Sequence, residues 1–165
     1  METSPKATLY PDAQIRNPME QGLAFQDFVC IQLSKHHIIL QNISSTKFQF
    51  EVGENLQGFE IKLDNRCTDT KQLSIETQEK SSRDMMFYTN SGILRNDNSF
   101  MYIQGNYDAF WMFSKKWLVR WLKEKKPEIK EYNGTLKSFY LPIDIADWGA
   151  VWKWNKQSES SVDTK

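Results

Sequence analysis

The chain has 165 residues, about the size of one domain, and its 39% hydrophobic residues can form one core, which argues against a separate cofactor domain. Its 21 basic and 21 acidic residues cancel, which argues against a histone-like polyanion binder but permits a local basic patch. No apolar stretch reaches the ~18 residues of a membrane span, and the opening segment lacks the apolar part of a signal peptide, so we expect a cytoplasmic protein with no membrane partner.

The N-terminal part predicts an arm followed by a helix. Residues 1–18 hold three prolines and no helical period, which is typical of an arm laid over the domain or left loose. From Met19 to Leu33 apolar residues recur at a spacing of three to four, which predicts an amphipathic helix. The segment from Ile38 to Phe50 predicts one or two short strands. We expect the folded domain to cover residues 19–156.

Two segments alternate strictly between apolar and polar residues and predict a β-hairpin. They are residues 58–64 and 73–80, joined by eight polar, turn-prone residues. All polar positions are even-numbered, and two registers fit this pattern. One register opposes Asp64 to Glu76, and the other opposes Asp64 to Ser74 with Glu76 as the diagonal neighbour. Either register brings two carboxylates within about 5 to 8 Å of each other.

The second half of the chain predicts a further hairpin, a helix and a strand. Residues 99–104 and 109–113 are aromatic-rich and flank Gly105-Asn106, which predicts the hairpin. A helix is expected to begin at Ser114 and to stop at Pro127. One more strand is expected within 134–143, followed by a tryptophan-rich segment of undetermined structure and a disordered tail at 157–165. The fold class expected is α/β or α+β, with a mixed central sheet flanked by the two helices.

The predicted helix after Ser114 is strongly basic. It holds six basic residues against one acidic residue, a net charge of +5, so the rest of the chain carries about −5. Such asymmetry would orient the protein on a polyanion, although a plain solvated helix face is an equally good interpretation. The side chains expected to hold a phosphate backbone are Lys115, Lys116, Arg120 and Lys123.

The acidic pair of the first predicted hairpin could hold a divalent cation. Two carboxylates at that separation repel each other unless a cation or a basic neighbour lies between them. Magnesium prefers oxygen ligands and needs only one or two protein carboxylates. Bound by Asp64 and Glu76, it could activate water for attack on a phosphodiester, with Lys62 and Gln78 orienting the water or the phosphate.

At these residues the chain resembles the PD-(D/E)XK nuclease superfamily, including small nuclease-like proteins of phages and bacteria. The resemblance rests on Asp64 as the first acid and on Glu76 as the acid of the acid-x-lysine motif. Gln78 stands where the family has lysine, as in some restriction endonucleases. The resemblance implies a restriction-endonuclease-like fold and a magnesium-dependent endonuclease, a hydrolase that also accepts manganese. It further implies that Glu20, in the first turn of the predicted helix, joins the metal shell.

Other interpretations remain open at this point. The polar faces of the first hairpin could carry ordinary cross-strand ion pairs. The same fold could also serve as a non-catalytic module that binds nucleic acid or a protein. For the catalytic interpretation the expected partner is DNA, and duplex cleavage would favour a homodimer. Cys30 and Cys67 are too few for a disulfide scaffold and form no C-x-x-C pair that would suggest structural zinc, so both are expected to be free thiols.

Overall fold

Helix α1 spans Pro18–Ser34 and confirms the first predicted helix. The Asn17 side chain caps it by accepting a hydrogen bond from the backbone N–H of Met19 (3.0 Å), and Pro18 occupies the first turn, where an N–H is not needed. The computed structural model describes residues 17–43 and 52–159. The predicted arm at 1–18 therefore lies outside the described residues except for its last two positions, and so does most of the strand region predicted before residue 50.

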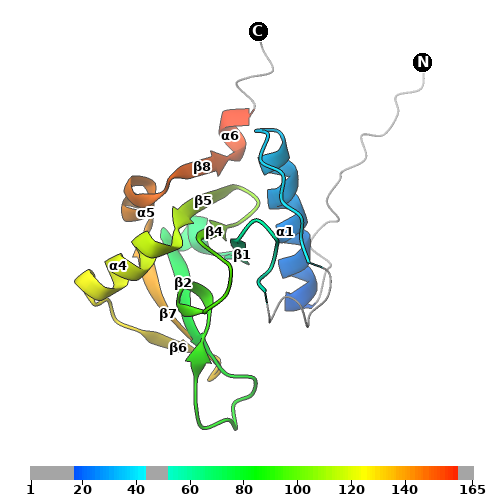
Figure 1. Ribbon diagram of the computed structural model, residues 1–165. Helices are drawn as coiled ribbons and strands as arrows, with labels where there is room; N and C mark the ends of the chain where they lie inside the picture. Colours follow the sequence, from blue (N-terminus) through cyan, green and yellow to red (C-terminus); the bar gives the residue numbers. More distant parts are fainter. Residues whose placement is uncertain (1–16, 44–51, 160–165) are drawn as a thin grey trace, which may run out of the picture.

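The first sheet contains four strands in the order β1-β4-β5-β8 (Figure 1). Strand β1 runs parallel to β4, while β4–β5 and β5–β8 are antiparallel pairs. The pair β4–β5 confirms the second predicted hairpin. A side chain at Gly105 would collide with the backbone of Ala109 and Phe110, so the turn needs glycine there. The strands are β1 (Phe59–Leu63), β4 (Met101–Gly105), β5 (Ala109–Ser114) and β8 (Trp152–Asn155).

The second sheet is antiparallel, with the order β3-β2-β7-β6. Its strands are β3 (Thr89–Asn90), β2 (Gln72–Glu79), β7 (Leu136–Pro142) and β6 (Lys130–Tyr132). The first predicted hairpin is therefore wrong, because β1 and β2 belong to different sheets. Between them the chain forms the short helix α3 (Cys67–Thr70), and Lys71 then adopts a left-handed conformation with φ 57°. This turn directs β2 away from an edge-to-edge pairing with β1.

The first sheet lies between α1 and the second sheet, so the protein has a core on each face of it (Figure 1). Alternate residues of the strands serve the two cores. Ile61, Ile103 and Phe110 pack against α1. Tyr102 and Phe113 pack on the opposite side, against a set from the second sheet and from two helices: Leu73, Ile75, Phe139, Leu141, Leu118 and Ala146. The architecture is a single α+β domain, one of the two predicted fold classes, but it contains two four-stranded sheets in place of one central sheet.

Three of the remaining helices connect strands of the two sheets, and the last one follows β8. In chain order they are η1 (Gly92–Leu94), α4 (Lys115–Lys125), α5 (Ile143–Gly149) and α6 (Lys156–Glu159). Helix α4 confirms the basic helix predicted after Ser114, and Lys126, at φ 46°, ends it just before Pro127. Helix α6 occupies the beginning of the predicted disordered tail. Within residues 17–43 and 52–159, none of the helices has the length and hydrophobicity that a membrane crossing requires.

Candidate functional site

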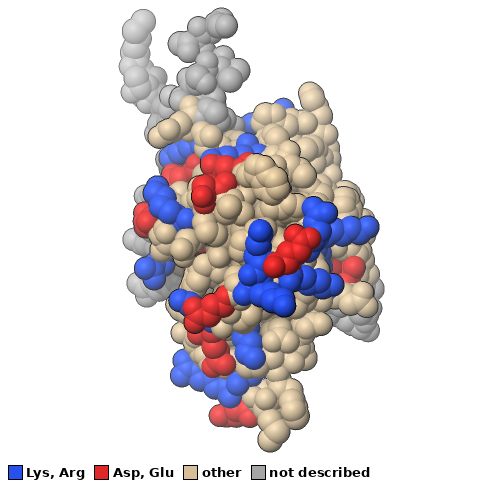
Figure 2. All heavy atoms as spheres, turned by 90° about the vertical axis from the view of Figure 1, so that its left-hand side faces the viewer, with Lys and Arg blue, Asp and Glu red and all other residues tan. Residues whose placement is uncertain are grey.

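The basic side chains of α4 gather on the face of the molecule that looks away from α1 (Figure 2). Lys116, Arg120 and Lys123 are exposed there. Arg120 pairs with Glu124 across 4.0 Å on the helix surface, and acidic side chains lie among the basic ones on this face. The surface is therefore locally basic but mixed in sign, which suits a few defined phosphate contacts better than bulk polyanion binding.

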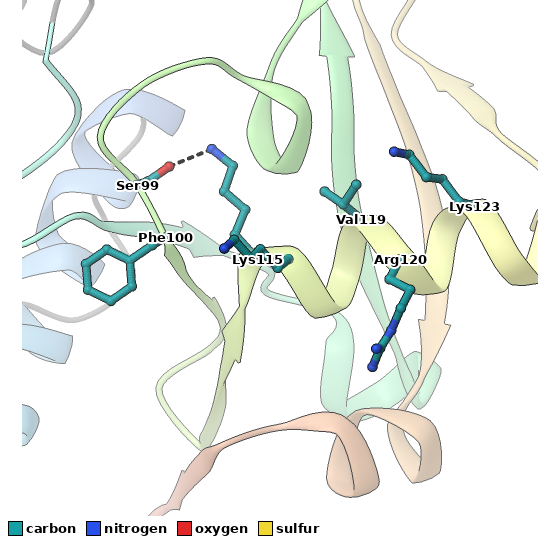
Figure 3. Close-up of a pocket in the computed structure, with 7 residues that line it drawn as sticks. Ser99, Phe100, Lys115, Val119, Arg120 and Lys123 are labelled. Carbon is teal, nitrogen blue, oxygen red and sulfur yellow. Dashed lines mark hydrogen bonds between the residues drawn. The ribbon is translucent and has the colours of Figure 1, made fainter.

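Lys115 differs from the other basic residues of α4 because its side chain turns into the protein (Figure 3). Its Nζ donates hydrogen bonds to the Arg95 carbonyl oxygen (2.8 Å), to Ser99 Oγ (2.6 Å) and to Asp97 Oδ1 (3.2 Å). The residue is only 8% exposed. Three oxygen acceptors thus hold the ammonium in place. Lys115, predicted as a phosphate contact, belongs to an internal polar network instead.

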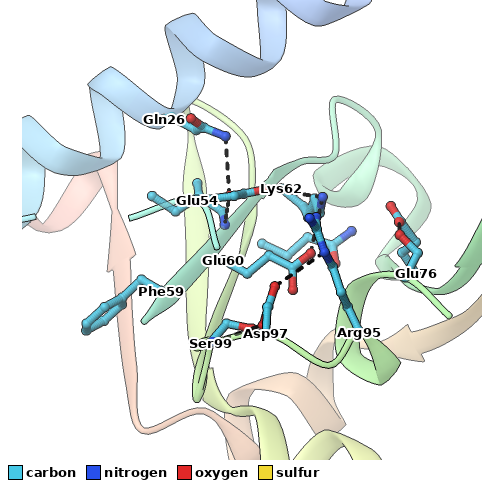
Figure 4. Close-up of polar contacts among 12 residues, drawn as sticks. Gln26, Glu54, Phe59, Glu60, Lys62, Glu76, Arg95, Asp97 and Ser99 are labelled. Carbon is cyan, nitrogen blue, oxygen red and sulfur yellow. Dashed lines mark hydrogen bonds and ion pairs between the residues drawn. The ribbon is translucent and has the colours of Figure 1, made fainter. Parts of the chain in front are cut away.

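Lys62 is the centre of a cluster of charged side chains between the two sheets (Figure 4). Its Nζ lies 3.3 Å from Glu54 Oε1 and 3.2 Å from Glu60 Oε1. Burial alone would lower the pKa of Lys62, but the attraction of Glu54, Glu60 and Glu76 outweighs burial and holds the pKa well above its ordinary value. The ammonium therefore stays protonated at neutral pH.

Glu60 is the most deeply buried acid of this cluster, with 2% exposure. Neither of its carboxylate oxygens accepts a hydrogen bond within the described part of the chain. Within the described residues, its charge is paired with Lys62 at 3.2 Å and with Lys115 at 3.9 Å. Burial raises the pKa of Glu60 and the negative charges of Glu54 and Glu76 raise it further, against the pull of the two lysines. Such an acid is costly to keep ionised, which is a common property of functional carboxylates.

Glu54 joins the cluster from the segment before β1. Its Oε2 accepts hydrogen bonds from the Ile61 backbone N–H (2.8 Å) and from Gln26 Nε2 of α1 (3.3 Å). These contacts anchor the carboxylate beside β1, with its other oxygen directed at Lys62. The cluster therefore combines an upstream acid with the sequence Glu60-Ile61-Lys62, in which acid and lysine extend from the same face of one strand.

Glu76 lies beside this cluster, and Asp64 lies apart from it. Glu76 accepts a hydrogen bond from Ser91 Oγ and is near enough to Lys62 to raise its pKa. Asp64 accepts hydrogen bonds from the backbone N–H groups of Ser74 (2.8 Å) and Arg66 (3.2 Å), and Gln104 Nε2 lies 3.4 Å away. Asp64 thus fixes the turn after β1 to the start of β2.

The two other predicted site residues are Gln78 and Glu20. Gln78 stands on β2 opposite Lys137 and Asn90, after an irregularity that interrupts the β2–β7 pairing at Thr77. Glu20 is exposed in the first turn of α1. The contacts recorded for the described residues do not connect either side chain to the Lys62 cluster. The structure thus brings together Lys62 and Glu76 among the predicted residues, but not Asp64, Gln78 or Glu20.

The sequence contained a signal for the cluster that its interpretation missed. Glu60 and Lys62 are separated by one residue on a predicted strand, so their side chains were certain to share a face. This acid-x-lysine spacing lies in β1, whereas the family resemblance placed the motif in β2. Glu54 could not have been found in this way, because it lies outside any strand and reaches Lys62 through the path of its loop.

Asp97 gives the network a testable pH dependence. Its burial raises the pKa, but hydrogen bonds from Ser99 and Lys115 outweigh burial and bring the pKa below its ordinary value of 3.8. A lowered folded-state pKa stabilises the fold above pH 3.8, and this contribution disappears as the pH falls through the folded-state pKa. We therefore expect the stability difference between the native protein and Asp97→Asn to shrink below pH 4 in urea titrations. Asp84→Asn, at an exposed site, should show no such change.

Carboxylate oxygens are the right donors for magnesium, but the cluster holds lysine ammonium groups between its acids. Among residues 17–43 and 52–159, no three His, Cys, Asp or Glu side chains converge closely enough to hold a metal ion as they stand. In comparisons with protein-family models, curated proteins and solved structures, the chain gives no match. The function is therefore inferred from the geometry and the chemistry of the side chains.

Proposed function

We propose that the protein is a magnesium-dependent nuclease of the PD-(D/E)XK type that hydrolyses DNA phosphodiester bonds, with Glu60-Ile61-Lys62 as its acid-x-lysine segment. The observation that supports this proposal best is Lys62 Nζ, held 3.2 and 3.3 Å from two carboxylates, with Glu76 beside them. In this assignment the acid-x-lysine motif lies on β1 and not on β2, and Gln78 has no catalytic part.

Glu60 and Glu76 are the residues that would hold magnesium. Both oxygens of Glu60 lack hydrogen-bond donors within the described residues, so they are available as ligands once the ammonium of Lys62 shifts toward a phosphate. The Lys62 side chain is 27% exposed and that of Glu60 only 2%, so Lys62 is the member of the pair that solvent reaches. Magnesium there would lower the pKa of a bound water and neutralise charge on the phosphodiester.

The role of Lys62 follows from its raised pKa. A permanently protonated ammonium can donate hydrogen bonds to a phosphate oxygen or to the attacking water, but it cannot remove a proton. Glu54 holds it in position, because the Glu54 carboxylate is itself fixed by Ile61 and Gln26. Lys62 would thus act as an orienting cation at the edge of the carboxylate pair.

The test compares two assignments of the motif in one assay. We expect the purified chain to cut plasmid or single-stranded DNA in Mg²⁺ or Mn²⁺ and to be inactive in EDTA. Lys62→Gln should lower the rate by ~10²-fold, about 2.7 kcal/mol in the barrier. Asp64→Asn should retain most of the activity, because Asp64 serves the turn after β1. Loss of activity in Asp64→Asn, at unchanged melting temperature, would instead favour the Asp64 and Glu76 assignment.

A second candidate function is non-catalytic binding of nucleic acid. The observation that favours it is that Lys62 and Lys115 already compensate Glu60, the acid that a metal would need. Binding of DNA with no cleavage in Mg²⁺ or Mn²⁺, on duplex or single-stranded substrates, would select this function over the nuclease.

A further inference from the structure

We infer that the pocket beside the start of α4 binds an unpaired nucleotide of a single-stranded nucleic acid. In this arrangement the base lies against Phe100 and the phosphates lie against the basic side chains of α4. The inference rests on the proposed nuclease function and specifies its substrate as single-stranded DNA or an unpaired end.

The pocket has a size that suits a nucleotide. Its volume is about 420 Å³, within the ~300 to 1,000 Å³ that small-molecule sites usually have. The backbone N–H of Lys115 donates to the Phe100 carbonyl oxygen (2.9 Å), which joins the segment before β4 to the first turn of α4. Figure 3 shows the residues that line the pocket: Ser99, Phe100, Lys115, Lys116, Val119, Arg120 and Lys123.

Phe100 is an exposed aromatic ring in a fixed position. It is 58% exposed, yet its ring lies 5.8 Å from the ring of Phe59, centroid to centroid. A Cβ at Gly58 would come within 2.7 to 2.8 Å of the Phe100 ring, so the ring packs directly on the Gly58 backbone, where a larger residue would collide with it. Gly58 also adopts φ 73°, which favours glycine independently. The ring is therefore packed against Phe59 and Gly58 and still more than half exposed, as a stacking surface should be.

The other wall of the pocket supplies positive charge. Lys116, Arg120 and Lys123 follow one another at helical spacing along one face of α4, with Val119 between them. Within the described residues no ion pair is recorded for Lys116 or Lys123, and Arg120 has only the 4.0 Å contact with Glu124. Aliphatic stems beside an aromatic ring, with ammonium and guanidinium groups at the rim, match a ligand that is flat, apolar and anionic. A nucleotide with its phosphates has this chemistry, whereas a paired base keeps its faces stacked.

The pocket also adjoins the proposed catalytic cluster. Ser99 and Lys115 line the pocket, and Lys115 Nζ bonds to Ser99 Oγ and approaches Glu60 Oε2 at 3.9 Å. A DNA strand with one base stacked on Phe100 would thus continue past Ser99 and Lys115 toward Glu60. This continuity supports a substrate pocket over an unrelated ligand site.

The test measures binding of the full chain to fluorescein-labelled oligothymidine by fluorescence anisotropy in EDTA, where magnesium-dependent cleavage is blocked. We expect oligothymidine to bind at least ~10-fold more tightly than an abasic strand of equal length. Phe100→Ala should remove this preference by weakening oligothymidine binding about 10-fold, with the affinity for the abasic strand within about 2-fold of native. Phe100→Leu keeps the packing on Gly58 and should behave in the same way if Phe100→Ala fails to fold.

The controls separate the base from the phosphates. Lys116→Gln and Lys123→Gln should weaken both strands and each flatten the salt dependence by about 0.7 units of log K per log salt. Phe87→Ala, at a ring that is 75% exposed elsewhere, should change neither. Equal affinity for the abasic strand, tighter binding of duplex, or equal losses on both strands in the Phe100 variants would overturn the inference. Base-dependent binding without any cleavage would support the nucleotide pocket and reject the nuclease function. Cleavage by Phe100 variants that bind both strands as the native protein does would reject the nucleotide pocket alone.

Discussion

The variant Glu60→Gln is expected to lose at least ~10³-fold of the magnesium-dependent cleavage rate, about 4 kcal/mol in the barrier, while it remains folded. The loss follows because Glu60 is the carboxylate proposed to hold the metal. The fold survives because each lysine beside Glu60 remains paired with a second carboxylate: Lys62 with Glu54, and Lys115 with Asp97. Rates on single-stranded DNA and urea unfolding of the same preparations measure the two effects separately.

The stability of this variant should also depend on pH with a defined sign. Burial raises the folded-state pKa of Glu60, so the native protein loses stability as the pH rises from its ordinary pKa of 4.5 through the folded-state pKa. Glutamine does not ionise, so Glu60→Gln should gain stability relative to native over that range. Glu128→Gln, at a carboxylate that is 77% exposed, is the control and should change neither rate nor stability. Full cleavage by Glu60→Gln would reject the proposed acid-x-lysine segment.

The strands and their faces could be predicted from the sequence, but their pairing could not. Alternation of side chains is a local property of the strand backbone, and the predicted faces of residues 59–63 and 73–79 are those observed. Pairing is set by partners far along the chain: β1 pairs with β4, and β2 pairs with β7. The eight-residue linker between the two predicted strands favoured a hairpin. Helix α3 and the left-handed Lys71 fit within this linker and place β1 and β2 in different sheets.

The wrong hairpin nevertheless brought some correct residues together. One predicted register opposed Asp64 to Ser74, and in the structure the Ser74 N–H does donate to Asp64. Glu76 likewise lies near Lys62, although through the contact of two sheets and not through a ladder. Polar residues on two strands can therefore meet where two sheets face each other as well as between paired strands of one sheet. Asp64 and Glu76 are both carboxylates on predicted polar faces, but they have different neighbours in the fold. The sequence pattern does not reveal those neighbours.

Helix α4 shows a second limit of the sequence. Its position and its positive charge were predicted correctly, since both follow from composition and from the cap and stop residues. Which of the lysines faces solvent depends on the segment that lies over the first turn. Asp97 and Ser99 belong to that segment, and they draw Lys115 inward while Lys116 stays outside. The sequence contained these acceptors but not their proximity to α4.

The variant Lys115→Met is expected to destabilise the protein by about 3 to 5 kcal/mol. Methionine has a similar length, so the loss would come from charge and hydrogen bonding and not from volume. Three oxygen atoms would each lose a donor, and Asp97, with its side chain 3% exposed, would lose the ammonium at 3.2 Å and keep the hydrogen bonds from Ser99 and the contact with Arg95 at 3.5 Å. Lys116→Met, one position further along α4 at an exposed site, should stay within about 0.5 kcal/mol of native. Urea unfolding at pH 7 measures both.

A double variant decides whether the destabilisation arises from the uncompensated charge. If it does, Asp97→Asn combined with Lys115→Met should cost less than the two single substitutions added together, because Asp97→Asn removes the anion that Lys115→Met leaves without its ammonium partner. Strict additivity would mean that the two side chains do not depend on each other, in spite of their 3.2 Å contact. Equal stability of Lys115→Met and Lys116→Met would mean that the internal network does not hold α4 to the segment before β4. The nucleotide pocket would then lack a fixed wall, because its two sides are joined at Lys115.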